Sequence, residues 1–126
     1  MSQTKIEKVL VVEDERSLMR LYTTKLQMSG YTVESAEDGE EALKKVATFM
    51  PDLILLDIII PKIDGFAVLE ALKESKKTAN IPVILLTNLG QDEDVEKGKK
   101  LGAKNYLIKS QFTPSEIVAK MEKTLQ

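Results

Sequence analysis

The sequence predicts one α/β domain in which a parallel five-stranded sheet lies between two layers of helices. Short apolar runs rich in β-branched residues alternate five times with longer amphipathic segments along the 126 residues. Three of the short runs are apolar throughout, as are parallel strands that are buried on both faces. Since crossovers between parallel strands are right-handed and the loops are short, we expect a doubly wound (βα)5 three-layer sandwich formed by residues 1–126.

Five short segments are the predicted strands. The continuous apolar runs are Lys8–Val12, Leu53–Leu56 and Val83–Leu86. Tyr31–Glu34 alternates between apolar and polar residues, and Tyr106–Ile108 is brief. We expect the last two at the edges of the sheet, because a central strand needs apolar residues on both faces.

Four of the intervening segments each carry an apolar stripe at helical spacing. The four stripes are Leu18, Leu21, Tyr22 and Leu26; Ala42, Leu43, Val46 and Ala47; Phe66, Leu69 and Leu72; and Ile117, Val118, Met121 and Leu125. Gly30 is expected to end the first helix, and Thr113–Glu116 has the capping residue, proline and glutamate that begin a helix.

The segment from Asp92 to Lys100 is the weakest predicted helix. It offers only Val95 and the following Leu101 for burial, and its internal Gly98 costs about 1 kcal/mol relative to alanine. We expect the least stable helix of the domain here. It is a candidate for motion, although an ordinary solvated surface helix has the same pattern.

The composition excludes several classes of function. Eighteen basic and twenty acidic side chains give a formal charge of −2, so we expect no direct binding of nucleic acid. The absence of cysteine and histidine excludes a thiol nucleophile, an imidazole base and a zinc site with those ligands. The remaining carboxylates, hydroxyls and amines suit Mg²⁺ and phosphoryl groups.

No apolar run approaches the roughly 20 residues that span a bilayer. The first eight residues also lack the apolar core of a signal peptide. We therefore expect a cytoplasmic protein that does not insert into membranes.

The residues that follow the predicted strands carry the chemistry. Glu13 and Asp14 follow the first strand, Asp57 the third, Thr87 the fourth and Lys109 the fifth. Each alone has an ordinary explanation, as a helix cap, a strand end or a solvated lysine. In a parallel sheet, however, all of them gather at one edge, where ligands bind.

Three carboxylates at one edge repel each other unless a cation lies among them. An all-oxygen site with few protein ligands suits Mg²⁺ better than Ca²⁺. The charge of Lys109 and the hydroxyl of Thr87 suit the oxygens of a phosphoryl group. Asp57, at the end of a buried strand, suits a nucleophile that forms an aspartyl phosphate.

Four segments in this order resemble the receiver domain of two-component response regulators, in particular stand-alone regulators of the chemotaxis type. They are Val9–Asp14, Leu53–Gly65, Pro82–Thr87 and Gly102–Lys109, and together they span nearly the whole chain. The resemblance implies a flavodoxin-like fold with strand order 2-1-3-4-5. It also implies a phosphorylation-activated switch in signal transduction that catalyses only its own phosphoryl transfer and dephosphorylation.

By this resemblance, Asp57 accepts a phosphoryl group from a phosphohistidine of a sensor histidine kinase or phosphotransfer protein. Asp14 binds Mg²⁺ directly and Glu13 through water, while Asp57 and the backbone carbonyl of Ile59 complete the protein ligands. Mn²⁺ is expected to substitute for Mg²⁺.

The resemblance also implies how the switch works. Thr87 and Lys109 contact the phosphoryl oxygens, and Tyr106 swings inward when Thr87 is drawn to the phosphate. The added charge of between about −1.5 and −2 thus changes the surface of the fourth helix, fifth strand and fifth helix, where an unknown partner protein binds. A tyrosine packed half inside an edge strand is the ordinary alternative for Tyr106. The expected state is a monomer or a phosphorylation-dependent dimer.

Three departures from the family pattern stand out. Ser110 occupies the place of a proline with a cis bond, and we expect a trans bond with Lys109 still reaching the site. Asn88 replaces a small residue and either narrows access to the phosphoryl group or donates a hydrogen bond to it. Ile59 and Leu89 are apolar and cannot orient a water, which predicts slow loss of the phosphoryl group.

Other functions are weighed against this one. A phosphatase of the haloacid dehalogenase type needs a second aspartate two residues after the nucleophile, where this chain has Ile59. A flavodoxin-like cofactor binder needs a phosphate-binding loop where the acidic segment Glu13–Glu15 lies. An interaction module that is never phosphorylated is a third possibility. Because Gln126 directly follows the last helix, we expect a stand-alone relay component with no output domain.

Overall fold

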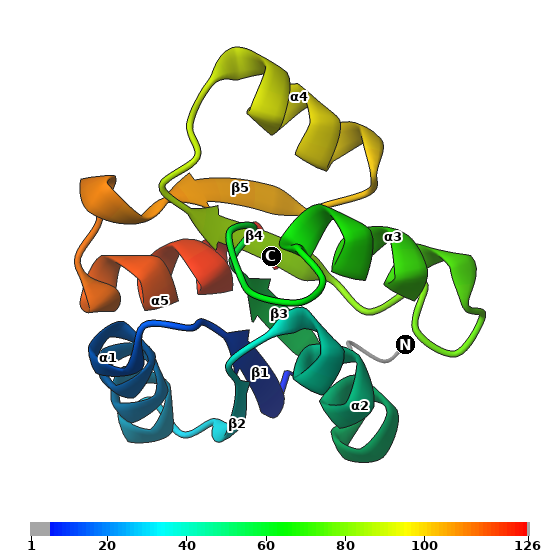
Figure 1. The fold of residues 1–126 in the computed structure, drawn as a ribbon. Coiled ribbons are helices and arrows are strands. Elements are labelled where there is room, and N and C mark those ends of the chain that lie inside the picture. The colour runs from blue at the N-terminus through cyan, green and yellow to red at the C-terminus, as the bar shows by residue number, and fades with distance from the viewer. Residues whose placement is uncertain (1–5, 126) are drawn as a thin grey trace.

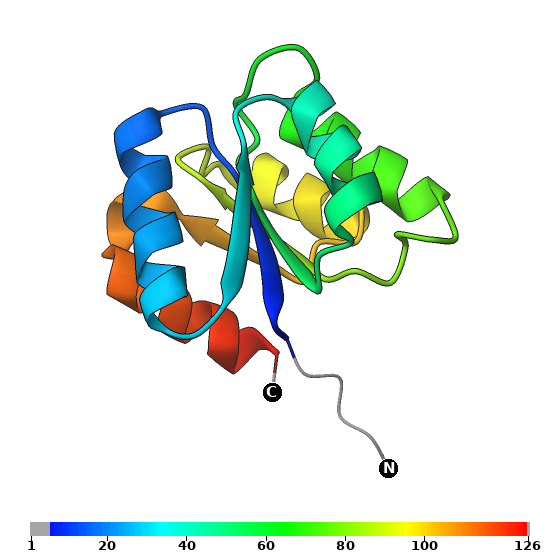
Figure 2. The same cartoon turned by 90° about the horizontal axis from the view of Figure 1, so that it is seen from below.

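The computed structural model describes residues 6–125 as a parallel five-stranded sheet between two layers of helices (Figures 1 and 2). The strands lie in the order β2-β1-β3-β4-β5, which confirms the predicted fold. The strands are β1 (Lys8–Val12), β2 (Thr32–Ala36), β3 (Leu53–Leu56), β4 (Val83–Thr87) and β5 (Asn105–Ile108). The two segments predicted as edge strands are at the edges.

The helices cover both faces of the sheet. They are α1 (Arg16–Met28), α2 (Gly39–Phe49), α3 (Gly65–Glu74), α4 (Asp92–Lys100) and α5 (Pro114–Thr124), with a 3₁₀ turn, η1, at Lys109–Gln111. In Figure 1, α1 and α5 lie on one side of the sheet and α2 and α3 on the other, with α4 next to the edge strand β5.

The core consists of two apolar layers that the sheet separates. Side chains along a strand point alternately to opposite faces. On β1, Leu10 and Val12 pack with α2 and α3, whereas Val9 and Val11 pack with α1 and α5. A strand that is apolar throughout is therefore buried on both sides, as the sequence predicts.

Two residues of the predicted apolar stripes are on the surface instead. The side chain of Leu21 in α1 is 52% exposed, and Ala47 in α2 is exposed as well. Each lies one residue from a buried neighbour, Tyr22 or Val46, and one residue is about 100° around a helix. Both residues therefore fall outside the stripe that contacts the sheet.

The predicted helix ends are confirmed. Thr113 and Glu116 form a reciprocal capping box at the start of α5, with Pro114 in the first turn. Gly30 follows the end of α1 with a φ of +97°, a left-handed conformation that glycine adopts without strain.

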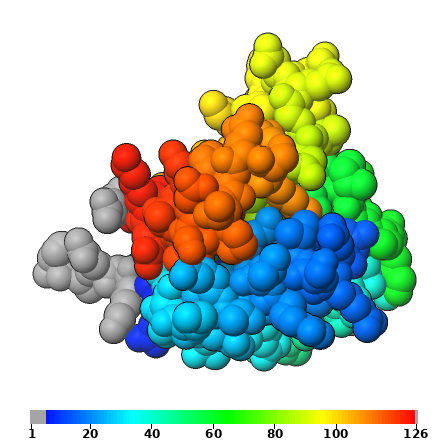
Figure 3. All heavy atoms as spheres, turned by 90° about the vertical axis from the view of Figure 1, so that its left-hand side faces the viewer, coloured from blue at the N-terminus to red at the C-terminus, as the bar shows by residue number. Residues whose placement is uncertain are grey.

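Helix α4 packs less deeply than the others. Gly98 is the only buried residue of α4. In Figure 3 the helix projects from the rest of the molecule. This shallow packing agrees with the prediction that α4 is the least stable helix.

Within residues 6–125 no helix combines the length and apolar character that a bilayer crossing demands. The first eight residues lack the apolar core of a signal peptide by sequence, and residues 1–5 of this segment lie outside the described residues, as does Gln126.

Candidate functional site

The predicted acidic residues meet at the carboxyl edge of the sheet. Glu13 and Asp14 follow β1 and Asp57 follows β3, and these two strands are neighbours in the sheet. One carboxylate oxygen from each residue lies within 4.8 Å of the others. Glu13 and Asp57 are buried, whereas Asp14 is exposed. The three side chains therefore form a cluster of oxygen ligands that is open on one side.

Lys109 lies against this cluster and bridges two of its members. Its ammonium group donates to Asp57 Oδ2 at 2.5 Å and forms an ion pair with Glu13 Oε1. The side chains of Lys109, Asp57 and Glu13 are only 9%, 6% and 3% exposed. The lysine thus offsets much of the repulsion between the two buried carboxylates.

The electrostatics of the cluster favour a divalent cation. Three carboxylates and one ammonium group carry a formal charge of −2, and all of them except Asp14 are largely shielded from water. Carboxylate oxygens are the ligands that hard cations such as Mg²⁺ prefer. The residues present therefore fit a magnesium ion in both charge and chemistry.

Burial shifts the ionisation of both partners of the buried ion pair. It raises the pKa of Glu13 above the usual 4.5, by more than the hydrogen bonds from Lys109 and from the Glu15 backbone lower it. Burial also lowers the pKa of Lys109, but the hydrogen bonds to Asp57 and Glu13 and the negative charges of these two carboxylates together outweigh that effect, and the net pKa is raised. Lys109 therefore stays charged at neutral pH.

A close approach of the backbone fixes Asp57. Its second oxygen, Oδ1, accepts from the N–H of Ile59 at 3.2 Å. The start of α3 packs on the same loop, where a Cβ atom on Gly65 would be 2.3 Å from the Asp57 carbonyl oxygen. Only glycine fits there, so α3 supports the loop that holds Asp57 in place.

The fifth residue of the site, Thr87, ends β4 and is fully buried. Its hydroxyl oxygen accepts from the N–H of Leu89 at 3.3 Å. A hollow of about 370 Å³ lies beside it, lined by Asp57, Ile59, Thr87, Asn88, Leu89 and Lys109. The hollow gives a phosphoryl-sized group access to Asp57.

The two departures Asn88 and Ser110 contact each other. The backbone N–H of Ser110 donates to Asn88 Oδ1 at 2.9 Å. The prediction for Ser110 is confirmed, since no cis peptide bond occurs within residues 6–125 and Lys109 still reaches Asp57. The Asn88 side chain therefore has a partner that neither sequence-based alternative foresaw.

Tyr106 is half-buried in β5. Its ring packs against the core layer that α2 and α3 cover and lies next to Gly98 of α4, and its hydroxyl donates to the carbonyl oxygen of Leu89. Burial, with smaller effects of Asp94 and Asp57, raises the pKa of this hydroxyl to about 12. This residue connects β5 to the loop that follows Thr87, while its movement as a switch stays a prediction.

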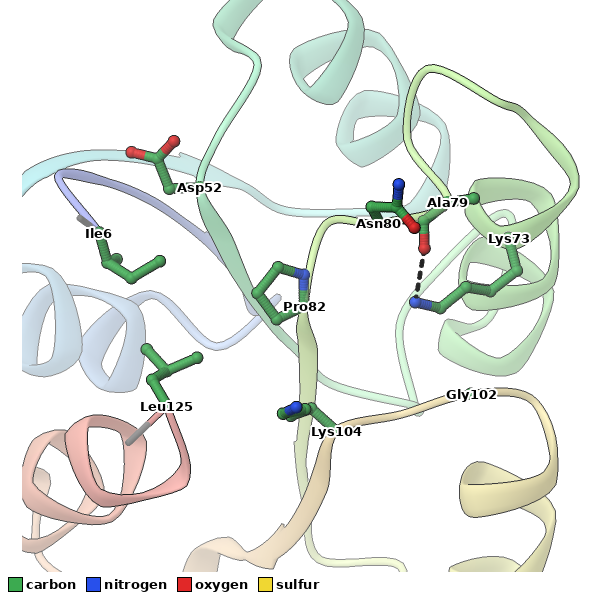
Figure 4. Close-up of a pocket in the computed structure, with 9 residues that line it drawn as sticks. All are labelled: Ile6, Asp52, Lys73, Ala79, Asn80, Pro82, Gly102, Lys104 and Leu125. Carbon is green, nitrogen blue, oxygen red and sulfur yellow. Dashed lines mark hydrogen bonds between the residues drawn. The ribbon is translucent and has the colours of Figure 1, made fainter. Parts of the chain in front are cut away.

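A larger hollow, of about 440 Å³, lies at the opposite end of the sheet (Figure 4). Two of its polar side chains stabilise the fold: Lys73 donates to the Ala79 carbonyl oxygen, and Asp52 accepts from the N–H groups of Glu7 and Lys8. The carboxylate cluster and the buried lysine are at the other edge, and we therefore assign the functional site there.

Sequence reasoning predicted that these residues meet at one edge of the sheet, which the structure shows, but it missed two contacts. It placed Lys109 toward a phosphoryl group and not between Glu13 and Asp57. It also treated Asn88 and Ser110 separately. Ser110, unlike proline, has a backbone N–H, and Asn88 has a side-chain acceptor, and these two features could have suggested the hydrogen bond between them. The Ile59 carbonyl as a metal ligand stays a prediction, since the contact seen is from its N–H.

The fold and this edge define a class of protein, the α/β domains with a carboxylate cluster at the carboxyl ends of parallel strands. A comparison with protein families narrows the class. The response regulator receiver domain family matches residues 9–122, and the chain belongs to this family. The members of this family are regulatory phosphoacceptor domains and not a family of catalytic enzymes. This assignment takes the place of the alternative that the chain is a phosphatase of the haloacid dehalogenase type.

Individual relatives agree with this assignment. The chain is 43% identical over 120 residues to a probable transcriptional regulator, ycf27, of Guillardia theta, covering 95% of this chain and 46% of that protein. The chemotaxis response regulator CheY4 of Vibrio cholerae has a TM-score of 0.87 at 32% identity, with 95% of this chain and 99% of that chain covered. The Mn²⁺-bound form of the response regulator Rcp1 has a TM-score of 0.82 at 30% identity, covering 93% and 92%.

The chain spans about half the length of the curated relatives that it matches, between 46% and 49% of those considered. Several of these relatives are transcriptional regulators by name. The similarity to them concerns this domain.

Proposed function

We propose that this domain is a phosphorylation switch in which Asp57 accepts a phosphoryl group from a histidine kinase or a phosphotransfer protein. The observation that carries the proposal is the buried Asp57 carboxylate, held by Lys109 within a cluster of three carboxylates. A buried nucleophile, a fixed cation and a cluster of metal ligands are the parts that phosphoryl transfer requires.

The transfer is a displacement at phosphorus. A carboxylate oxygen of Asp57 attacks the phosphorus, the bond between phosphorus and the donor's imidazole nitrogen breaks, and the imidazole leaves with the electron pair. Lys109 then faces the new phosphoryl oxygens, and the Thr87 hydroxyl lies beside the same hollow to donate to one of them. The aspartyl phosphate persists because neither Ile59 nor Leu89 can orient a water toward it.

Mg²⁺ is the proposed cofactor, with Mn²⁺ as a substitute. Asp14, Glu13 and Asp57 would hold the ion, together with the backbone carbonyl of Ile59. When bound, Mg²⁺ would neutralise charge that develops on the phosphoryl oxygens. The similar response regulator Rcp1 has a structure in a Mn²⁺-bound form, which supports a divalent metal in this family.

The proposed output is a change of surface. Thr87, drawn toward the phosphoryl group, moves the loop on which Tyr106 holds the Leu89 carbonyl, and so affects α4, β5 and α5. A downstream protein would bind this face in the cytoplasm.

The mass of the intact protein after incubation with Mg²⁺ and acetyl phosphate tests this proposal. One phosphoryl adduct should form, should require Mg²⁺ and should be absent in Asp57→Asn. A folded, Mg²⁺-binding sample that takes up no phosphoryl group from acetyl phosphate or from histidine kinases would instead support the interaction module.

A further inference from the structure

We propose that Asn88 is a positioning residue for Lys109, acting through the backbone of Ser110. The inference rests on the proposed function, because it assigns Asn88 a part in phosphoryl transfer to Asp57. The Oδ1 atom of Asn88 is already engaged, because it accepts a hydrogen bond from the Ser110 N–H at 2.9 Å.

The contact extends the β4–β5 ladder beyond the ends of both strands. The last register pair of the two strands is Thr87 with Ile108. Asn88 is one residue beyond the end of β4 and Ser110 is two residues beyond the end of β5. The Asn88 side chain accepts a hydrogen bond from the Ser110 backbone N–H there. Lys109 therefore lies between a backbone pair on one side and a side-chain contact on the other.

This arrangement restrains the backbone of Lys109 next to the carboxylates that its side chain contacts. The Lys109 side chain is drawn to two buried carboxylates, Asp57 and Glu13, and its backbone begins the short turn η1. When a metal ion occupies the carboxylates, the lysine loses part of this hold. The contact from Asn88 then keeps its backbone beside Asp57, so that the ammonium group remains at the phosphoryl oxygens.

The same contact connects the two residues proposed to touch the phosphoryl group. Asn88 directly follows Thr87, and Ser110 directly follows Lys109. A displacement of either side chain is therefore transmitted to the other loop. A proline at position 110 could not take part, because proline has no backbone N–H to donate.

The test compares the wild type with three variants by four measurements. Asn88→Ala removes the acceptor, Asn88→Asp keeps one at the same place, and Ser110→Ala is the matched control that retains the backbone N–H. The measurements are amide hydrogen exchange of Ser110, the ¹⁵N resonance of the Lys109 ammonium group, the affinity for Mg²⁺, and the rate of phosphorylation by acetyl phosphate.

In Asn88→Ala we expect faster exchange at Ser110, a shifted Lys109 resonance and phosphorylation that is about three- to tenfold slower, the effect of one lost hydrogen bond. The affinity for Mg²⁺ should stay within about twofold of wild type, since the metal ligands are untouched. Asn88→Asp should restore the Ser110 protection and the Lys109 resonance, and Ser110→Ala should match wild type in all four measurements.

Two results would overturn the inference. Unchanged exchange at Ser110 in Asn88→Ala would show that the hydrogen bond does not exist in solution. Faster exchange with the Lys109 resonance and the phosphorylation rate as in wild type would show that the bond only holds the loop. A wild-type protein that takes up no phosphoryl group would refute the proposed function instead, and the exchange and resonance data would still decide whether Asn88 positions Lys109.

Discussion

Lys109 contacts two buried carboxylates at once, and this explains how three acidic side chains can share one edge of the sheet. The sequence predicted which residues meet there, because parallel strands bring their ends together whatever their side chains do. It could not predict that the lysine takes the position between Glu13 and Asp57. That depends on the path of a long side chain, which residue spacing does not determine.

Removing the ammonium group should destabilise the metal-free protein. In Lys109→Met, two buried carboxylates lose their cation, and we expect a loss of about 3–5 kcal/mol in the free energy of unfolding at pH 7.5. Burial already raises the pKa of Glu13. A folded-state pKa above the unfolded value means that stability is regained as the pH falls, so the gap to wild type should narrow toward pH 5.

Urea unfolding in EDTA at the two pH values measures this difference. Lys104→Met, which changes an exposed lysine, is the control and should stay within about 0.5 kcal/mol of wild type. A gap that widens on acidification would contradict the role given to the buried carboxylates.

The lifetime of the phosphoryl group should depend on Ile59. Its side chain is 61% exposed at the rim of the hollow beside Asp57, where an amide could orient a water molecule. We expect Ile59→Asn to lose the phosphoryl group severalfold faster than wild type, and Ile59→Leu to behave as wild type. Decay followed by intact mass after removal of the donor tests this, and a wild type that decays much faster than Ile59→Asn would refute it.

At the scale of elements, α4 shows both what a pattern can predict and what it cannot. Its few apolar residues predict shallow packing, and the structure agrees. Its internal glycine looked only like a cost to the helix, but a Cβ atom on Gly98 would be 2.6 Å from Leu85 Cδ1 and 3.0 Å from the Tyr106 ring. Helix propensity is a local property and does not predict such contacts between elements. For the same reason it did not predict that Leu21 in α1 is exposed.

Gly98→Ala should therefore not stabilise the protein as a mid-helix alanine usually does. The gain of about 1 kcal/mol in helix propensity is opposed by an overpacking cost of about 1–3 kcal/mol. We expect a net change between zero and about 2 kcal/mol of destabilisation, together with shifted NMR signals of the Tyr106 ring. Glu96→Ala, at an exposed position of the same helix, should leave those signals unchanged. A gain of about 1 kcal/mol with unchanged ring signals would contradict the packing role of Gly98.

At the scale of the whole molecule, the parallel sheet, the two core layers and the edge that holds the site follow from the alternation of strands and helices, whereas the strand order was implied by the resemblance to receiver domains. The central strands are apolar on both faces, so they can only lie inside the sheet. What the alternation left undetermined is the pairing of loops beyond the strands, such as Asn88 with Ser110. Those contacts depend on backbone directions that have no periodic pattern.

Divalent metal should stabilise the whole fold, because it binds the folded edge and not the unfolded chain. At a Mg²⁺ concentration of 100 times its Kd, the expected gain is about 2.7 kcal/mol, seen as a higher Tm than in EDTA. Asp14→Asn removes an exposed carboxylate. It should leave the Tm in EDTA nearly unchanged and abolish most of the response to Mg²⁺. An equal response in this variant would place the ion elsewhere.

The hollow in Figure 4 has Ile6 and Leu125 among its lining residues, so both ends of the described chain lie together at one pole of the sheet. The acidic cluster lies at the other pole. A biotin or a fluorophore attached beside Ile6 or Leu125 would therefore lie far from Asp57. The domain can be immobilised on a sensor surface through such a label with the acidic cluster facing the solution, which permits kinase docking to be followed on the tethered protein.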